Sequence, residues 1–243
     1  LLEASLPLAP DAENAAIARS QGNPLYALQL VHAWASSGQL SLDGGQYRVP
    51  SAALERQAKT TAELFDERLE MLPPELRPGA LATAALGEVV QTEGISWLLS
   101  ALGLDAASAF NALQQAQILM VSRSGRVRWP HALLQEHMIA RLNASPDAKR
   151  VYHLAAEALA RYPDAGSRRI VRQRVTSLIL AGDEDAAGRM MLDFVARAWR
   201  RARDVGWIRG DLMILEGHVR GPLAAEFLRW RAEVERHLGN LSE

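Results

Sequence analysis

The sequence contains no cysteine among its 243 residues. That absence excludes disulfide bonds, cysteine-based zinc sites and thiol nucleophiles, and it is what we expect of a cytoplasmic protein. No apolar run reaches the roughly 18 residues that a bilayer-spanning helix requires, and no signal peptide is evident. We therefore expect a protein without a membrane partner.

The sequence is also poor in lysine, in aromatic residues and in net charge. Lys59 and Lys149 are the only lysines, and the 27 basic residues are balanced by 28 acidic ones, for a net charge of −1. A nearly neutral chain has no global field that would attract nucleic acid or an anionic membrane. Aromatics make up 6% of the residues, while alanine, leucine, arginine and glutamate are abundant, which favours helix over strand.

The common catalytic motifs are missing as well. The sequence has no phosphate-binding Gly-x4-Gly-Lys-Ser/Thr loop, no Gly-x-Gly-x-x-Gly, no His-Glu-x-x-His and no Gly-x-Ser-x-Gly. His131 and His137 are six residues apart and so lie on different faces of a helix, which argues against a shared metal. We expect no catalytic residue and no metal site in these residues.

Hydrophobic periodicity and helix boundary signals predict a mainly α-helical protein. Asp43-Gly44-Gly45 predicts a short β-hairpin between 40–42 and 46–49, and a second hairpin is expected around Ser124-Gly125. The predicted helices cover approximately 11–21, 25–36, 60–72, 74–86, 93–102, 106–117, 131–142, 146–161, 166–181, 184–204, 210–217 and 222–238.

These elements predict four segments. Three of the helices predicted within 60–144, followed by a hairpin and a closing helix, are the pattern of a winged-helix domain, and 39–59 forms a hairpin and linker before it. Helix pairs of roughly 35–40 residues in 145–243 indicate tetratricopeptide-like repeats. Residues 1–38 contain two further helices.

The corner Gly22-Asn23-Pro24 has two interpretations. Glycine ends a helix and proline begins the next, so the corner has a purely structural explanation. Alternatively, Pro24 presents a rigid apolar edge to an adenine ring, while the helix behind it moves as part of a lid.

His131 also has two interpretations. It is either a capping or packing histidine, or a phosphate sensor at the start of a helix, where the helix dipole assists anion binding.

The C-terminal region is rich in arginine, from Arg168 to Arg203. We favour a solvated face in ion pairs with Asp183, Glu184, Asp185 and Asp193 over a nucleic-acid surface, because aromatic residues are sparse among the arginines. Trp199, Trp207 and Trp230 are expected to pack between helices.

Several motifs together resemble the STAND-type ATPases, the signalling branch of AAA+ P-loop proteins. Ala18–Tyr26 is similar to their Gly-x-Pro segment, and Arg150–Leu159 to the entry of their helical-repeat region. Four stretches resemble their winged-helix region, namely Arg68–Pro73, Ala84–Gly87, Ala112-Leu113 and Trp129–Glu136. The resemblance covers about residues 10–162.

The resemblance implies that residues 1–38 are the last helices of an ATPase lid, that Pro24 touches adenine and that His131 contacts the β-phosphate of ADP. Both contacts require an ATPase core that these residues lack, so ATP or ADP and Mg would be cofactors of a longer parent protein and not of this chain. Because the chain opens with Leu1, we expect a fragment of such a protein.

Three functions remain open at this stage. The preferred one is a non-catalytic regulatory fragment of a bacterial signal-transduction protein, in which nucleotide state is coupled to a protein partner bound by the repeats. The parent would contain the ATPase core in cis and, as an output, a kinase, cyclase or DNA-binding domain. The alternatives are a winged-helix transcription regulator, disfavoured by the absence of Arg and Lys from 105–117, and a stand-alone helical-repeat adaptor.

Overall fold

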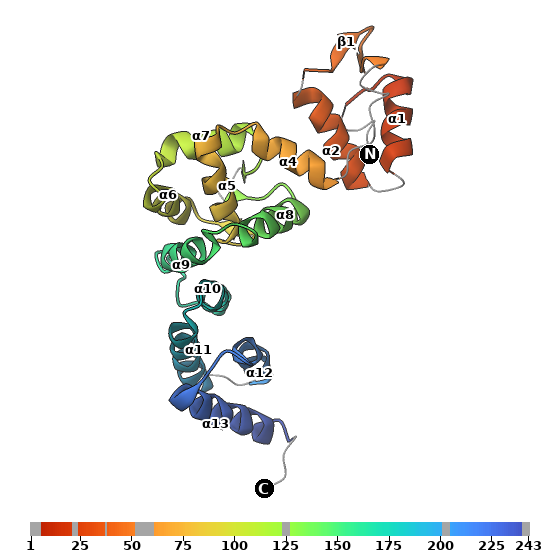
Figure 1. The fold of residues 1–243 in the computed structure, drawn as a ribbon. Coiled ribbons are helices and arrows are strands. Elements are labelled where there is room, and N and C mark those ends of the chain that lie inside the picture. The colour runs from red at the N-terminus through yellow and green to blue at the C-terminus, as the bar shows by residue number, and fades with distance from the viewer. Residues whose placement is uncertain are drawn as a thin grey trace. The chain divides into compact units, whose positions relative to one another are not determined.

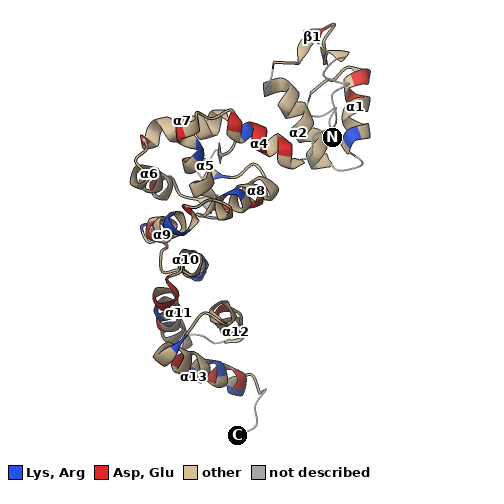
Figure 2. Cartoon of the chain, viewed as in Figure 1, with Lys and Arg blue, Asp and Glu red and all other residues tan. Residues whose placement is uncertain are grey.

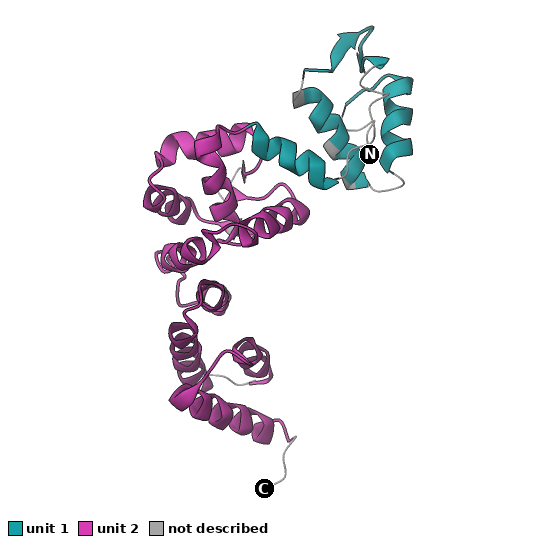
Figure 3. Cartoon of the chain, in the orientation of Figure 1, with its two compact units in different colours: residues 1–71 teal, residues 72–243 magenta. Residues whose placement is uncertain are grey.

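A computed structural model describes residues 6–20, 24–36, 38–51, 61–122, 127–200 and 205–239. The chain is mainly helical with two small antiparallel β-sheets (Figure 1), which confirms the expected fold class. It divides into two compact units, residues 1–71 and 72–243 (Figure 3).

The first unit packs helices against one another beside a hairpin. It contains α1 (Pro10–Ser20), α2 (Pro24–Ser36), β1 (Ser41–Asp43), β2 (Gln46–Arg48) and α4 (Thr61–Glu70). Its hairpin confirms the prediction from Asp43-Gly44-Gly45, since Gly44 and Gly45 have φ of 57° and 83°, as a tight hairpin turn requires. Tyr47 joins the hairpin to the segment before α1, because its N–H donates to the Pro7 carbonyl at 2.7 Å. The core is made by Leu8, Ala12, Ala16, Tyr26, Leu30, Val31, Trp34, Val49 and Leu64.

The first part of the second unit combines helices with a three-stranded antiparallel sheet in the order β3-β5-β4. The elements are η1 (Pro74–Leu76), α5 (Arg77–Ala84), β3 (Val89–Val90), α6 (Thr92–Ala101), α7 (Ala106–Gln115), β4 (Met120–Val121), β5 (Val127–Arg128) and α8 (Ala132–Asn143). The turn expected at Ser124-Gly125 lies outside the described residues, but β4 and β5 on either side of it are paired. Strand β3 was not predicted, because two residues are too short to show an alternating pattern.

The second part of this unit is a succession of helices, each packed against the next (Figure 1). They are α9 (Ala148–Leu159), α10 (Arg168–Ala181), α11 (Glu184–Trp199), α12 (Gly206–Leu212), η2 (Met213–Leu215) and α13 (Gly221–His237). Side-chain caps begin α10 and α11, where the oxygens of Ser167 and Asp183 accept from the N–H groups three residues on.

The helix predicted over 210–217 begins earlier in the structure, because α12 starts at Gly206 and Gly210 lies inside it. Apolar burial accounts for the difference, because Ile208 and Leu212 are both buried on one side of this short helix. Within the described residues, none of the helices combines the length and apolar character needed to cross a bilayer.

Candidate functional site

His131 is the N-cap of α8. Its Nδ1 accepts a hydrogen bond from the Leu134 N–H at 3.2 Å, so the capping role considered for this histidine is real. A neutral imidazole that accepts through Nδ1 has its proton on Nε2. The ring therefore has the tautomer that a donor to a phosphate oxygen needs, and capping does not exclude that second role.

The residues on either side of His131 make two hydrogen bonds to the end of α5 and the segment that follows it. Trp129, two residues before the histidine, is 4% exposed, and its indole Nε1 donates to the Gly87 carbonyl at 3.1 Å. Gln135, one turn into α8, donates through Nε2 to the Ala84 carbonyl, also at 3.1 Å. The residues before and after His131 are thus both held to the segment from Ala84 to Gly87.

Pro24 is the first residue of α2 and is exposed to solvent. This confirms the helix start at the proline, while Gly22 and Asn23 lie outside the described residues. Pro24 belongs to the first unit and His131 to the second, and each is described within its own unit. A nucleotide pocket formed by the two residues stays a prediction.

A buried carboxylate, that of Asp211, lies among the helices of the C-terminal region. Asp211 of α12 is 0% exposed and accepts from Nε and Nη2 of Arg168 at 2.8 to 3.1 Å. Arg172, one turn further along α10, donates to the same carboxylate. The hydrogen bonds to Asp211 raise the pKa of Arg168 above its ordinary value, while partial burial opposes that rise.

This cluster replaces the ion pairs expected for these arginines. Arg168 and Arg172 pair with Asp211 instead of an acid from 183–193, and Arg169 pairs with Asp164 at 3.3 Å. Sequence analysis overlooked Asp211 because its partners are about forty residues away. The one available signal was an acid in a short stretch flanked by apolar Ile208 and Leu212.

The tryptophans of the repeats pack as expected. Trp199, Trp207 and Trp230 are partly buried against the core of this region, and the rings of Trp199 and Trp230 meet edge to face at 5.7 Å between centroids. Arg168 lies over the ring of Trp207 at 4.7 Å. These contacts leave the indoles as packing residues between helices.

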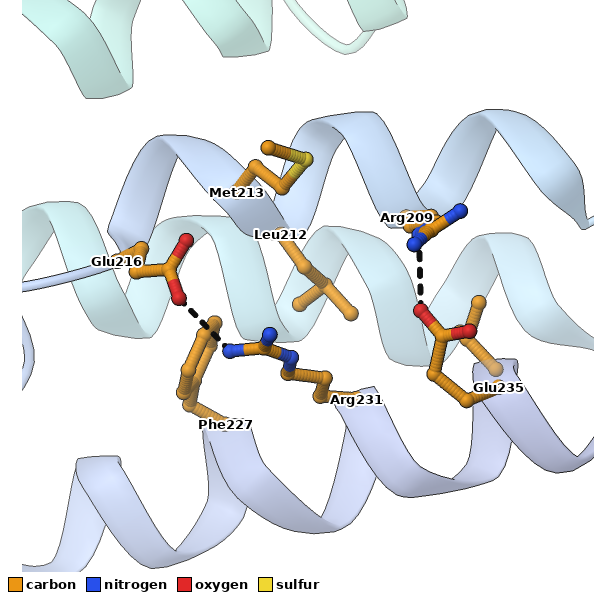
Figure 4. A pocket seen from close by; sticks show the side chains of 8 residues that line it. Arg209, Leu212, Met213, Glu216, Phe227, Arg231 and Glu235 are labelled. Atoms are coloured by element: carbon orange, nitrogen blue, oxygen red, sulfur yellow. Dashed lines mark hydrogen bonds and ion pairs between the residues drawn. The ribbon is translucent and has the colours of Figure 1, made fainter. Parts of the chain in front are cut away.

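A small hollow lies between α12 and α13 (Figure 4). Its volume is about 90 Å³, and Leu212, Phe227 and Val234 are among its lining residues. Ion pairs flank it, Arg209 with Glu235 and Arg231 with Glu216, both at 2.8 Å (Figure 4). Pockets for small-molecule ligands are usually at least about 300 Å³, so this hollow is too small for a nucleotide.

Across the part of the chain that the structure describes, no three His, Asp or Glu side chains are placed to hold a metal ion. The groups that could bind a ligand are therefore His131 at its helix cap and the arginine cluster around Asp211.

The order of elements defines a class of fold: paired helices with a hairpin, then helices around a three-stranded sheet, then stacked helices. No protein-family model and no curated protein matches the chain. Among solved structures, the fold is similar to that of a Signal Transduction ATPase with Numerous Domains (STAND) protein with a tetratricopeptide repeat sensor from Pyrococcus horikoshii. The TM-score is 0.52 and the sequence identity 17%, over 94% of this chain and 35% of that protein. This chain thus spans about a third of that protein's length.

Proposed function

We propose that this chain is a non-catalytic regulatory part of a STAND-type signalling ATPase. In this proposal a winged-helix domain and tetratricopeptide-like repeats couple the nucleotide state of an ATPase core on the same polypeptide to a protein partner. The observation that supports it best is the fold similarity to a STAND protein over 94% of the chain, which extends through both units.

The winged-helix part of the proposal is supported by topology. Helix α5, strand β3, helices α6 and α7, and the β4–β5 pair follow one another in the order of a winged helix, with β5 at the centre of the sheet. The succession from α9 to α13 supports the repeats, because each helix packs against its neighbour in sequence. Residues 1–38 would then be the end of an ATPase lid.

In the parent protein, ATP or ADP with Mg²⁺ would be held mainly by the core, and His131 would donate from Nε2 to a phosphate oxygen. Pro24 would contact the adenine. The conformational equilibrium of the whole protein would then respond both to nucleotide and to a partner on the repeats. Such a switch would operate in the cytoplasm.

A winged-helix DNA reader is the second candidate, and the composition of α7 argues against it. This helix occupies the position of a recognition helix but contains no Lys or Arg (Figure 2). Non-specific DNA affinity comes mostly from such cations. A salt-dependent gel shift at low salt would favour DNA binding over the proposal, while an unshifted duplex agrees with it.

The proposal predicts that this chain alone binds ADP or ATP only weakly. Two isolated contacts, from Pro24 and His131, cannot replace the backbone amides and lysine of a phosphate loop. We expect no heat of binding in calorimetry up to roughly millimolar ADP. Each tenfold gain in affinity needs about 1.4 kcal/mol of binding free energy, and two contacts supply too little of it. Binding in the micromolar range would place the phosphate site within this chain and contradict the proposal.

His131 allows its two roles to be separated in a protein that includes the core. His131→Asn replaces the capping Nδ1 by a side-chain oxygen that can cap the helix but removes the imidazole, whereas His131→Ala removes both the cap acceptor and the imidazole. Loss of the cap costs about 1 kcal/mol of stability, so only the alanine variant should melt earlier. Both variants should release bound ADP faster if the imidazole contacts phosphate.

Equal ADP retention in wild type and His131→Asn would remove the sensor role and leave the cap. The alanine variant then serves as the control, because its lower melting temperature shows that the substitution reached a structured site. A third candidate, the stand-alone adaptor, also predicts a partner on the repeats but no effect of nucleotide on partner affinity.

A further inference from the structure

The segment from Ala84 to Gln91, between α5 and α6, is held from two sides. On the side of α8, the Trp129 indole donates to the Gly87 carbonyl and the Gln135 amide to the Ala84 carbonyl. Both bonds end on backbone carbonyls, and Trp129 is almost fully buried. Moving the strand that leads into His131 would therefore leave a buried indole N–H unpaired or shift Gly87 with it.

On its other side the same segment meets α10 of the repeats. Gly87 has a φ of 94°, and a Cβ built on it would lie 2.1 Å from Nε2 of Gln173. The amide of Gln173 therefore rests directly on the Gly87 backbone. Gly87 is the one residue of the segment that receives both the Trp129 hydrogen bond and the Gln173 side chain.

The end of the segment is fixed by the loop between α9 and α10. The Gln91 N–H donates to the phenol oxygen of Tyr162 at 3.2 Å, and the Gln91 side chain donates to Asp164 at 3.1 Å. Tyr162 is 3% exposed, and its ring lies so close to α6 that a Cβ on Gly94 would be 2.2 Å from it. Burial raises the pKa of Tyr162, against the opposing effect of the Gln91 hydrogen bond.

We propose that residues 84–91 form a joint that couples the position of His131 to that of α10. The side-chain contacts at Gly87 join Trp129, two residues before His131, to Gln173 of α10. The Tyr162 contacts hold the far end of the segment in place. The coupling is expected in this chain by itself. Its use as a path between nucleotide and protein partner rests on the proposed function.

Coupling between two sites is shown only by a measured effect of one site on the other, because adjacency alone does not demonstrate it. Hydrogen exchange of the 243-residue chain without nucleotide provides that measurement. Trp129→Phe removes the indole N–H and keeps an aromatic ring. We expect it to speed amide exchange in Arg168–Ala181 about threefold or more, and Gln173→Ala to do the same in Ala132–Asn143.

The control variant is Gln115→Ala, at an exposed position of α7, which should change exchange in neither helix. The internal control is α13, whose exchange should stay unchanged in all variants. Two outcomes would overturn the joint: no faster exchange beyond the residues next to the substitution, or equal acceleration everywhere including α13, which would indicate global destabilisation.

A glycine pair tests the contact itself. Gly87 and Gly103 have similar positive φ values of 94° and 82°, but a Cβ on Gly103 would meet nothing within 4 Å. Gly87→Ala should therefore accelerate exchange in α10 beyond any effect of Gly103→Ala, and adding Gln173→Ala should recover part of that difference. Identical effects of the two glycine substitutions would contradict the Gln173 contact.

These experiments fail independently of the proposed function. Unaltered ADP retention in His131→Asn would refute the nucleotide role but leave the exchange results standing. Conversely, uncoupled exchange in α8 and α10 would remove the joint while leaving His131 as a sensor whose signal takes another route.

Discussion

At the residue scale, the structure separates what a side chain does for the fold from what it could do for a ligand. His131 illustrates this, because its Nδ1 is used by the α8 cap and only its other nitrogen is chemically suited to donate to phosphate. Sequence alone offered both roles for His131 as alternatives. The cap is visible in the structure, and the sensor role remains a proposal because it needs groups from a core.

Asp211 provides a prediction at the same scale. Asp211→Asn keeps the shape of the side chain but removes the charge that holds Arg168 and Arg172. Breaking a fully buried pair costs about 3–5 kcal/mol, but the two arginine side chains are 44% and 40% exposed and can turn to water. We therefore expect a loss of about 1–3 kcal/mol, measured by urea unfolding.

The control for this substitution is Glu233→Gln, which removes an exposed pair with Arg236 on α13. Exposed pairs of this kind contribute at most about 0.5 kcal/mol. If both variants lose the same small amount, Asp211 does not stabilise the contact between α10 and α12.

At the element scale, the sequence predicted the elements whose signals are local and missed those set by distant contacts. The hairpin at Asp43–Gly45 and the α2 start at Pro24 follow from residues within the element itself. Strand β3 exists because β5 pairs with it, and nothing near Val89–Val90 indicates that partner. The arginine cluster was missed for the same reason.

At the scale of elements, replacing two helical glycines by alanine should change the free energy of unfolding in opposite directions. Gly94 of α6 faces the ring of Tyr162, whereas a Cβ on Gly210 of α12 would meet nothing within 4 Å. Gly210→Ala should stabilise by about 0.5–1 kcal/mol through the higher helix propensity of alanine. Gly94→Ala should destabilise by about 1–3 kcal/mol, the usual cost of overpacking.

Thermal and urea unfolding of the two alanine variants would measure both effects. Because the substitution is the same, propensity contributes equally and the difference isolates the Tyr162 contact. A stabilised Gly94→Ala variant would mean that Tyr162 does not rest on α6, and it would also weaken the joint proposed for residues 84–91.

At the scale of the whole molecule, His32 should make the stability of the first unit depend on pH. His32 of α2 has its pKa lowered below the ordinary value of 6.5, first by partial burial and second by the charge of Arg68 on α4. The pKa of Arg68 is itself lowered by burial. The first unit therefore favours a neutral His32.

The sign of the resulting pH dependence follows from proton binding. Well above pH 6.5, His32 is neutral in both the folded and the unfolded chain, and its contribution to stability is constant. As the pH falls below 6.5, the unfolded chain takes up a proton first, so the free energy of unfolding of the first unit decreases. Because the His32 residue is still accessible to solvent despite this partial burial, the effect should be modest.

Hydrogen exchange in wild type and His32→Gln, compared at about pH 7.5 and about pH 5.5, would test this dependence. Intrinsic exchange rates cancel when the two proteins are compared at one pH. The ratio of wild-type to variant exchange in α2 and α4 should rise on acidification, because only the wild type contains the group that protonates on unfolding. Helix α6, which contains no histidine, should show a constant ratio. A constant ratio in α2 as well would mean that His32 titrates alike in folded and unfolded chains, and that acid does not act on the first unit through this residue.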